Sequence, residues 1–273
     1  MKERIPMLID GKAIAAELLA ELESQKREFA GKKVLGILVG DNAASLSFLR
    51  QKKHVAAELG VIFSVRRIQT PIAEGELVAR VAKLAGKADV IGAIVQLPIP
   101  GTNTEAVLNA VPYEKDIDCL GERRAREYYK HPAEALIAPP AVGTVRRILR
   151  SVGVGDVRGK RLTVYGFGRL VGKPVAAWGR AAGANVTVLR RSSTRGEIVA
   201  ALQSADIVVT GVGQTNLVSV ADIRPGTIVI DFGYPADIDA ASADKRGIIV
   251  TPTPGGTGPV LVVELFRNLY AIA

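Results

Sequence analysis

The sequence predicts an α/β protein made of two domains, each with parallel strands that alternate with helices. Three observations support this prediction. Short apolar runs alternate with segments whose apolar residues recur at helical spacing. An irregular stretch over 113–143 interrupts the alternation, which then restarts with a glycine-rich turn behind its first strand. Strands joined through helices imply right-handed crossovers, so we expect two α/β layers that share a cleft.

The first part of the chain contains three predicted strands and three predicted helices. Asp41 or Asn42 can cap the second helix, and Gly60 ends it. Two prolines, Pro98 and Pro100, stop the third strand. In chain order we expect a helix over 11–30, a strand over 32–40, a helix over 44–60, a strand over 61–68, a helix over 73–86 and a strand over 88–100.

The stretch 113–143 mixes charge, proline and glycine without a sustained period. A long irregular segment in a compact protein is typical of a domain junction or an active-site loop. After it we expect a strand over 161–166, a helix over 169–183, a strand over 185–191, a helix over 195–205, strands over 206–213, 226–233 and 247–252, and a helix over 258–273.

Composition narrows the functional classes. The chain has 273 residues and a formal net charge of +9, but its basic residues are scattered among acidic ones. Without a zinc-finger spacing or an aromatic-basic RNA-binding strand, we expect no nucleic-acid partner. A basic surface also attracts small polyanions such as phosphorylated cofactors or carboxylated substrates.

The chain carries no pattern that predicts export, membrane insertion or metal binding. Charges interrupt every apolar run near the N-terminus, which argues against a signal peptide, and no run has the length to cross a membrane. A single cysteine, Cys119, excludes an intrachain disulfide and a cysteine-rich zinc site. We therefore expect a cytoplasmic protein with no membrane partner and no metal.

The segment "VYGFGRLVG", residues 164–172, follows a predicted strand and opens a predicted helix. This is the context of a dinucleotide-binding turn. Gly166 permits a tight turn, Gly168 allows close approach to a pyrophosphate, and Gly172 can pack the helix against the strand. The helix N-terminus then offers free N–H groups to the phosphates. The spacing is one residue longer than the usual fingerprint, so the turn alone leaves a purely structural role open.

The end of the following strand indicates which dinucleotide is bound. An NAD site usually places Asp or Glu there, to hold the ribose 2′-hydroxyl. Here Arg190, Arg191 and Ser192 occupy that point. Guanidinium groups suit a 2′-phosphate through charge-assisted hydrogen bonds. The sequence therefore favours NADP as cofactor, with a solvated basic strand end as the alternative.

Five motifs occur in the order "LVGDNAAS…FLRQKKHVAAELG", "IVQLPIP", "KDID", "VYGFGRLVGKP" and "VTPTPGGTGPV". Together they resemble the methylenetetrahydrofolate dehydrogenase/cyclohydrolase family, the bifunctional FolD enzymes, from about residue 7 to the C-terminus. The resemblance implies oxidation of 5,10-methylenetetrahydrofolate with NADP, followed by hydrolysis of the methenyl product to 10-formyltetrahydrofolate. It also implies a catalytic folate-binding domain over 1–142, completed by a returning C-terminal helix within 255–273, a Rossmann-like NADP-binding domain over 143–254, and a homodimer.

The resemblance assigns roles to individual residues. Lys52 matches the acid/base lysine of the cyclohydrolase step, for which burial would lower the pKa. Gln96 matches the glutamine beside that lysine, and Asp118, rather than Asp116, matches the pterin-binding carboxylate. Substrate contacts are implied for Ser45, Phe48, Pro254, Gly255 and Gly256, and cofactor contacts for Gly166, Phe167, Gly168, Arg190, Arg191, Ser192 and Tyr234.

Several positions depart from the family pattern. Phe48 replaces a tyrosine, which keeps a stacking face but loses the hydroxyl. Cys119 replaces a glycine at a point where the loop could require a positive φ. The "GFG" turn replaces Gly-Arg-Ser, which removes an arginine near the phosphates. These departures leave two alternatives open: a dehydrogenase with weak or absent cyclohydrolase, and a non-catalytic folate- or nucleotide-binding relative.

Overall fold

The computed structural model describes residues 8–23 and 26–272. Its described residues form two compact units, each with its own parallel sheet. We call them the three-stranded unit, with residues 17–130, 135–140 and 262–272, and the five-stranded unit, with residues 8–16, 131–134 and 141–261. The predicted α/β class is thus confirmed. The domain boundaries expected from the sequence stay predictions, since these units divide the chain differently in detail.

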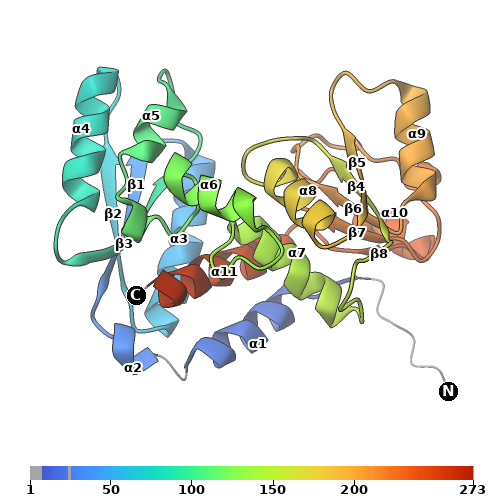
Figure 1. Ribbon diagram of the computed structural model, residues 1–273, viewed down its shortest axis with the longest axis horizontal. Helices are drawn as coiled ribbons and strands as arrows, with labels where there is room; N and C mark the ends of the chain where they lie inside the picture. Colours follow the sequence, from blue (N-terminus) through green and yellow to red (C-terminus); the bar gives the residue numbers. More distant parts are fainter. Residues whose placement is uncertain (1–7, 24–25, 273) are drawn as a thin grey trace. The chain divides into compact units, whose positions relative to one another are not determined.

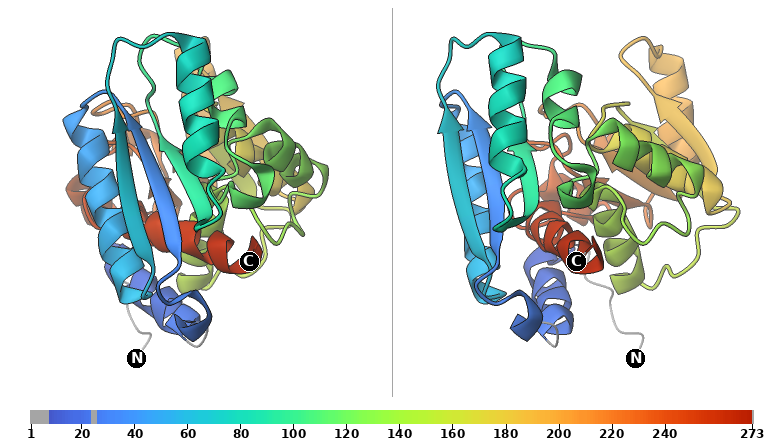
Figure 2. Two further views of the ribbon diagram at one scale, coloured as in Figure 1. Left: turned by 90° about the vertical axis from the view of Figure 1, so that its left-hand side faces the viewer. Right: turned by 60° about the vertical axis from the view of Figure 1, so that its left-hand side comes forward.

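The sheet of the three-stranded unit has the order β2-β1-β3. Its strands are β1 (Lys33–Val39), β2 (Ile62–Ile68) and β3 (Val90–Gln96), and all pairings are parallel. The helices α3 (Ala43–Glu58) and α4 (Glu74–Ala85) lie on opposite faces of the sheet (Figure 2). α3 begins after Asn42, whose side chain accepts a hydrogen bond from the Ser45 amide at 2.9 Å, so one of the two expected caps is confirmed.

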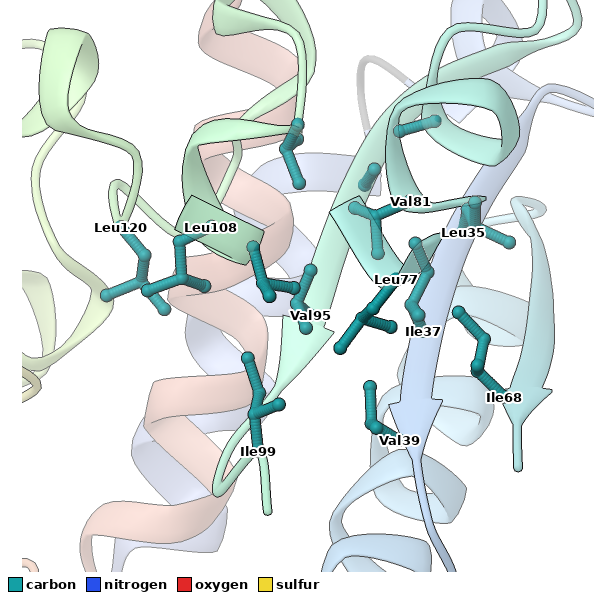
Figure 3. Close-up of a cluster of buried hydrophobic side chains, with 14 of the residues drawn as sticks. Leu35, Ile37, Val39, Ile68, Leu77, Val81, Val95, Ile99, Leu108 and Leu120 are labelled. Atoms are coloured by element: carbon teal, nitrogen blue, oxygen red, sulfur yellow. The ribbon is translucent and has the colours of Figure 1, made fainter. Parts of the chain in front are cut away.

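Alternate strand residues bury one apolar cluster between this sheet and α4. Leu35, Ile37 and Val39 of β1 face Leu77 and Val81 of α4 (Figure 3). This period-2 pattern on β1 and the i, i+4 pair on α4 are what a sheet covered by a helix requires. The helix α5 (Thr104–Asn109) adds Val107 and Leu108 to the same cluster.

The opposite face of the sheet is covered by α3 and by the last turns of α11 (Thr257–Ile272). A Cβ on Gly36 would lie 3.0 Å from Leu49 of α3, and a Cβ on Gly92 would lie 2.8 Å from Leu269 of α11. The two glycines thus allow both helices to approach the strands closely. Residues 262–272 belong to this unit, which confirms that the C-terminal helix returns to it.

The stretch 113–143 is more regular than the sequence suggested. It contains the short 3₁₀ helix η1 (Tyr113–Lys115), the helix α6 (Glu122–Lys130) and the start of α7 (Pro140–Ser151). On α6 the buried residues are Arg124 and Tyr128, four positions apart. Because an arginine occupies one of these positions, the apolar pattern does not reveal the helix.

The sheet of the five-stranded unit has the order β5-β4-β6-β7-β8, with every neighbouring pair parallel (Figure 1). α8 packs against Leu162 of β4 through Gly179, while Thr163 of the same strand donates a hydrogen bond to Ala201 of α9 on the other face. The elements are β4 (Arg161–Tyr165), α8 (Gly172–Ala181), β5 (Asn185–Leu189), α9 (Arg195–Ser204), β6 (Ile207–Thr210), β7 (Ile228–Asp231) and β8 (Ile249–Val250).

This strand order places a switch point at β4. The chain moves from β4 to β5 on one side and then crosses to β6 on the other side. In open parallel sheets, ligands bind outside the carboxyl ends of the strands at such a point. The two loops that leave β4 and β6 there touch, since a Cβ on Gly166 would lie 2.8 Å from Cγ2 of Val212. The predicted Rossmann-like arrangement is therefore present.

Some expectations need correction. The helix expected over 11–30 consists of α1 (Gly11–Glu23) and α2 (Lys26–Phe29), with 24–25 outside the described residues. Neither α10 (Ala240–Lys245), η2 (Val220–Asp222) nor the helix α7 was expected from the sequence. The apolar runs of β6 and β7 lie fully buried inside the sheet. Their composition therefore gives no support to a dimer.

Candidate functional site

Lys52 lies on the buried face of α3. It follows Ser45 and Leu49 at helical spacing, and its side chain is only 7% exposed, unlike that of a surface lysine. Its Nζ donates a hydrogen bond to Oε1 of Gln96 at 2.8 Å. Among the described residues this is the one hydrogen bond recorded for that ammonium group, which has three N–H donors. Donor capacity therefore remains for a ligand.

Gln96 ends β3 and is itself held in place. Its Nε2 donates to the carbonyl oxygen of Leu97 at 3.0 Å, and this bond fixes which end of the amide faces the lysine. The Oε1 atom is therefore directed at Lys52, as the resemblance implied. A strand end and a helix face, 44 residues apart in the chain, thus come together.

Asp118 lies in the loop 116–121, which follows η1 and carries two aspartates with different surroundings. Asp116 is buried, and its carboxylate accepts hydrogen bonds from the amides of Gly121 at 2.8 Å and Leu120 at 3.4 Å. Asp118 is partly exposed, and no described residue donates a hydrogen bond to its carboxylate. Asp116 thus closes the loop while Asp118 stays available, which supports the choice of Asp118 over Asp116.

Burial shifts the pKa values of the charged groups in this site toward neutral forms. It lowers the pKa of Lys52, and the Asp118 carboxylate opposes that shift only in part. It raises the pKa of Asp118 to about 6, against the opposing effect of Lys52 and with the help of Asp116. The expected lowering at Lys52 is confirmed. Near neutral pH, Asp118 still carries its charge.

Ser45 and Phe48 lie on α3 before Lys52. The Ser45 hydroxyl, which is buried, donates to the Leu97 carbonyl at 3.4 Å and so joins α3 to the strand end beside Gln96. Phe48 is half-buried and one helical turn from Lys52. Since positions i and i+4 share a helix face, its ring and the ammonium group can reach one ligand.

The glycine turn after β4 has the geometry of a phosphate-binding loop. Gly166 has a φ of 92°, and a Cβ on Gly172 would lie 2.0 Å from the carbonyl oxygen of Gly166. These two positions therefore require glycine for the turn itself. A Cβ on Gly168 would meet nothing within 4 Å, so internal packing does not explain this glycine. The space above Gly168 is open.

α8 begins directly behind this turn without a side-chain cap at Val171. The Lys173 amide donates to the carbonyl oxygen of Gly168 at 3.0 Å and Pro174 has no N–H, so this helix start offers fewer amides to an anion than the sequence suggested. Arg190 and Arg191 follow β5, and both side chains are exposed. The Arg190 guanidinium lies 4.1 Å from the centroid of the Phe167 ring, which belongs to the glycine turn. The exposed Ser192 comes next. The expected cofactor residues around the glycine turn are thus neighbours.

Tyr234 and the segment 254–256 belong to other loops of the five-stranded unit. Tyr234 follows β7 with a 70% exposed ring, and its backbone lies against Gly213 in the loop after β6. Gly255 has a φ of 98°, and a Cβ on Gly256 would lie 2.5 Å from the carbonyl oxygen of Pro252. Pro254, Gly255 and Gly256 therefore form a tight turn before α11.

One organising residue of this unit was missed. Asp237 is fully buried and accepts hydrogen bonds from Oγ1 of Thr210 at 2.6 Å, the Val212 amide at 2.8 Å and the Gln214 amide at 2.7 Å. It thereby fixes the loop that touches Gly166. An aspartate in an irregular segment is common in sequences, so nothing in the pattern marks it.

Within residues 8–23 and 26–272, no three His, Cys, Asp or Glu side chains gather as a metal-binding group. No helix in the same residues has the length and apolarity to cross a membrane.

Comparisons with known proteins match both halves of the chain. The family model described as "Tetrahydrofolate dehydrogenase/cyclohydrolase, catalytic domain" matches residues 9–118, and the one described as its "NAD(P)-binding domain" matches residues 139–273. The bifunctional protein FolD of Pelobacter propionicus is 33% identical over 274 residues, which cover 96% of this chain and 95% of that protein.

Solved structures give the same result. The structure of Trypanosoma brucei N5,N10-methylenetetrahydrofolate dehydrogenase-cyclohydrolase, complexed with NADP cofactor and inhibitor, has a TM-score of 0.89 and 29% identity, with coverage of 97% of this chain and 96% of that one. A 5,10-methylenetetrahydrofolate dehydrogenase from the silkworm, Bombyx mori, has a TM-score of 0.88 and 28% identity, with coverage of 97% and 96%.

Proposed function

Because the chain belongs to the tetrahydrofolate dehydrogenase/cyclohydrolase family, we propose that it oxidises 5,10-methylenetetrahydrofolate with NADP and hydrolyses the methenyl product to 10-formyltetrahydrofolate. The observation that carries this proposal is the buried Lys52, held by Gln96 at 2.8 Å beside Asp118. This arrangement unites an acid/base group with a carboxylate suited to a pterin.

Lys52 suits the hydrolytic step. Hydrolysis adds a water oxygen to the methenyl carbon and then breaks the bond from that carbon to one folate nitrogen. A group must therefore take a proton from the water and return one to the nitrogen. The lowered pKa increases the neutral amine fraction of Lys52, which can accept the first proton. Gln96 orients that amine and can align the water.

The five-stranded unit has the features of an NADP site. Bound NADP would accept a hydride from the methylene carbon of the folate. The turn at Gly166 and Gly168 and the uncapped start of α8 would hold the pyrophosphate, and Arg190 and Arg191 would hold the 2′-phosphate. The room above Gly168 supports this fit.

Asp118 is proposed to bind the amino-pyrimidinone edge of the pterin, whose adjacent N–H groups match two carboxylate oxygens. Asp118→Ala is expected to raise the KM for folate in both reactions by roughly tenfold to a hundredfold, because a charge-assisted hydrogen bond contributes about 1.5–3 kcal/mol. The KM for NADP should barely change. A defect confined to NADP would remove Asp118 from the pterin site.

The pH dependence of kcat/KM for folate tests the role of Asp118 independently. Below about 6 the Asp118 carboxyl becomes protonated and loses acceptor capacity. The kcat/KM for folate should therefore fall on the acid side of that value, since kcat/KM reports groups of the free enzyme. In Asp118→Ala this acid limb should be absent. If kcat/KM for folate still falls below about 6 in Asp118→Ala, the titration of another group causes that fall.

Two broader features are proposed from the family resemblance alone. They are a cytoplasmic location and assembly as a homodimer. Neither depends on the residues discussed above.

A further inference from the structure

The loop 116–121 holds Asp118 in a conformation that its own sequence does not favour. Cys119 follows Asp118 with a φ of 57°, in the left-handed region. A residue other than glycine in this region costs on the order of 1–3 kcal/mol and persists only when the surroundings enforce it. Asp116 closes the loop from within, through Leu120 and Gly121. A contact from outside the loop can help to enforce this conformation.

Asn268 provides that contact from α11. Asn268 is fully buried, and its Oδ1 accepts a long hydrogen bond from Nη2 of Arg267 at 3.5 Å. Its Nδ2 donates to the carbonyl oxygens of Ile117 at 2.9 Å and Ala138 at 2.7 Å, and it lies 3.9 Å from Sγ of Cys119. Both partners are carbonyl oxygens, so the amide must present its NH₂ group to them.

The bond to Ile117 bears directly on Asp118. The carbonyl oxygen of Ile117 and the N–H of Asp118 belong to one planar peptide group. Holding that oxygen therefore fixes the plane from which the Asp118 side chain departs. The bond to Ala138 ties the same amide to the segment before α7. Asn268 thus connects α11 and a second segment to the residue immediately before Asp118.

We propose that Asn268 is a positioning residue for folate binding, acting through the Ile117 peptide to hold the Asp118 carboxylate beside Lys52. This inference rests on the proposed role of Asp118 in binding the pterin. A side-chain amide is costly to bury unless its donors are satisfied. Both N–H groups of Asn268 are satisfied on the carbonyl oxygens of Ile117 and Ala138.

The test begins with Asn268→Ala. We expect the KM for folate to rise about tenfold in both reactions, within the range that small misplacements of a positioned group cause. The KM for NADP should stay within about twofold of wild type, because the residues proposed to bind NADP are not the ones proposed to bind folate. Should this variant fail to fold, Asn268→Ser keeps one hydroxyl donor in the same space, and a smaller rise in the same KM is expected.

Phe266→Leu is the matched control. Phe266 lies on the same helix and packs edge-on against Phe63 at 6.3 Å between ring centroids. Urea unfolding should show a loss of stability for both variants, because each opens space in the core. Only Asn268→Ala should change the KM for folate. An equal rise in Phe266→Leu would assign the effect to general loosening of α11 and overturn the proposal.

A double-mutant cycle separates positioning from simple stabilisation. In the Asp118→Ala background, Asn268→Ala should add little, because the carboxylate that it positions is gone. A full additional rise in KM would overturn the positioning role. A rise for Asp118→Ala with none for Asn268→Ala would overturn it and leave the function of Asp118 intact. An unchanged KM in Asp118→Ala would overturn both.

Discussion

Replacing Lys52 with methionine is expected to slow hydrolysis of methenyltetrahydrofolate by about 10²–10⁴-fold, the usual contribution of one acid/base group. Methionine has an unbranched stem of similar length, so it can occupy the buried space on α3 without a void. Gln96 is partly exposed, so water can replace the lost donor at its Oε1. The free energy of unfolding should therefore not fall, and the loss should be confined to chemistry.

The measurement is the decay of methenyl absorbance with purified variant, corrected for the uncatalysed reaction. Lys53→Met is the control, since Lys53 is the exposed neighbour of Lys52 on the same helix and loses the same charge. It should hydrolyse at the wild-type rate. If Lys52→Met also does so, the role assigned to Lys52 is wrong.

Replacing both Arg190 and Arg191 with alanine is expected to raise the KM for NADP more than about tenfold while the KM for NAD changes little. Each guanidinium supplies charge-assisted hydrogen bonds to a 2′-phosphate that NAD lacks. Both side chains are exposed, so part of their contribution is screened Coulomb attraction. The preference for NADP over NAD should therefore shrink as salt is added to the wild-type enzyme.

A control for lost charge is Arg180→Ala combined with Lys245→Ala. Both residues are exposed and lie in the last turns of α8 and α10. After each of these helices the chain enters the next strand at the amino edge of the sheet. The pyrophosphate turn lies at the opposite, carboxyl edge. This double variant should leave the KM for both cofactors near wild type. Equal effects of the Arg190/Arg191 variant on NADP and NAD would show that these arginines do not select the 2′-phosphate.

The elements that the sequence predicted well are those whose apolar pattern is regular. α4 buries apolar residues at helical spacing, the strands β4, β6 and β7 are continuous buried runs, and each of these elements was expected. α6 was missed because its buried positions are an arginine and a tyrosine. β6 and β7 are apolar throughout because both faces of central parallel strands are covered.

In the candidate site, too, the sequence revealed some residues and not others. Lys52, Gln96 and Asp118 could be found because motifs carried them, and Lys52 and Gln96 are in hydrogen-bond contact. Asn268 and Asp237 could not, because their importance lies in which distant backbone groups they bond. Asn268 is one of several polar residues in α11, beside Glu264 and Arg267, so the sequence pattern does not single it out. Such contacts depend on the fold, and local sequence does not encode them.

The most direct test of the bifunctional proposal follows both reactions in one absorbance trace. Purified protein is mixed with 5,10-methylenetetrahydrofolate and NADP, and NADPH, the methenyl compound and 10-formyltetrahydrofolate are measured over time. We predict that NADPH and 10-formyltetrahydrofolate rise together while the methenyl compound remains a minor transient. Accumulation of the methenyl compound at the rate of NADPH formation would contradict the hydrolytic half of the proposal, and absence of NADPH would contradict the proposal as a whole.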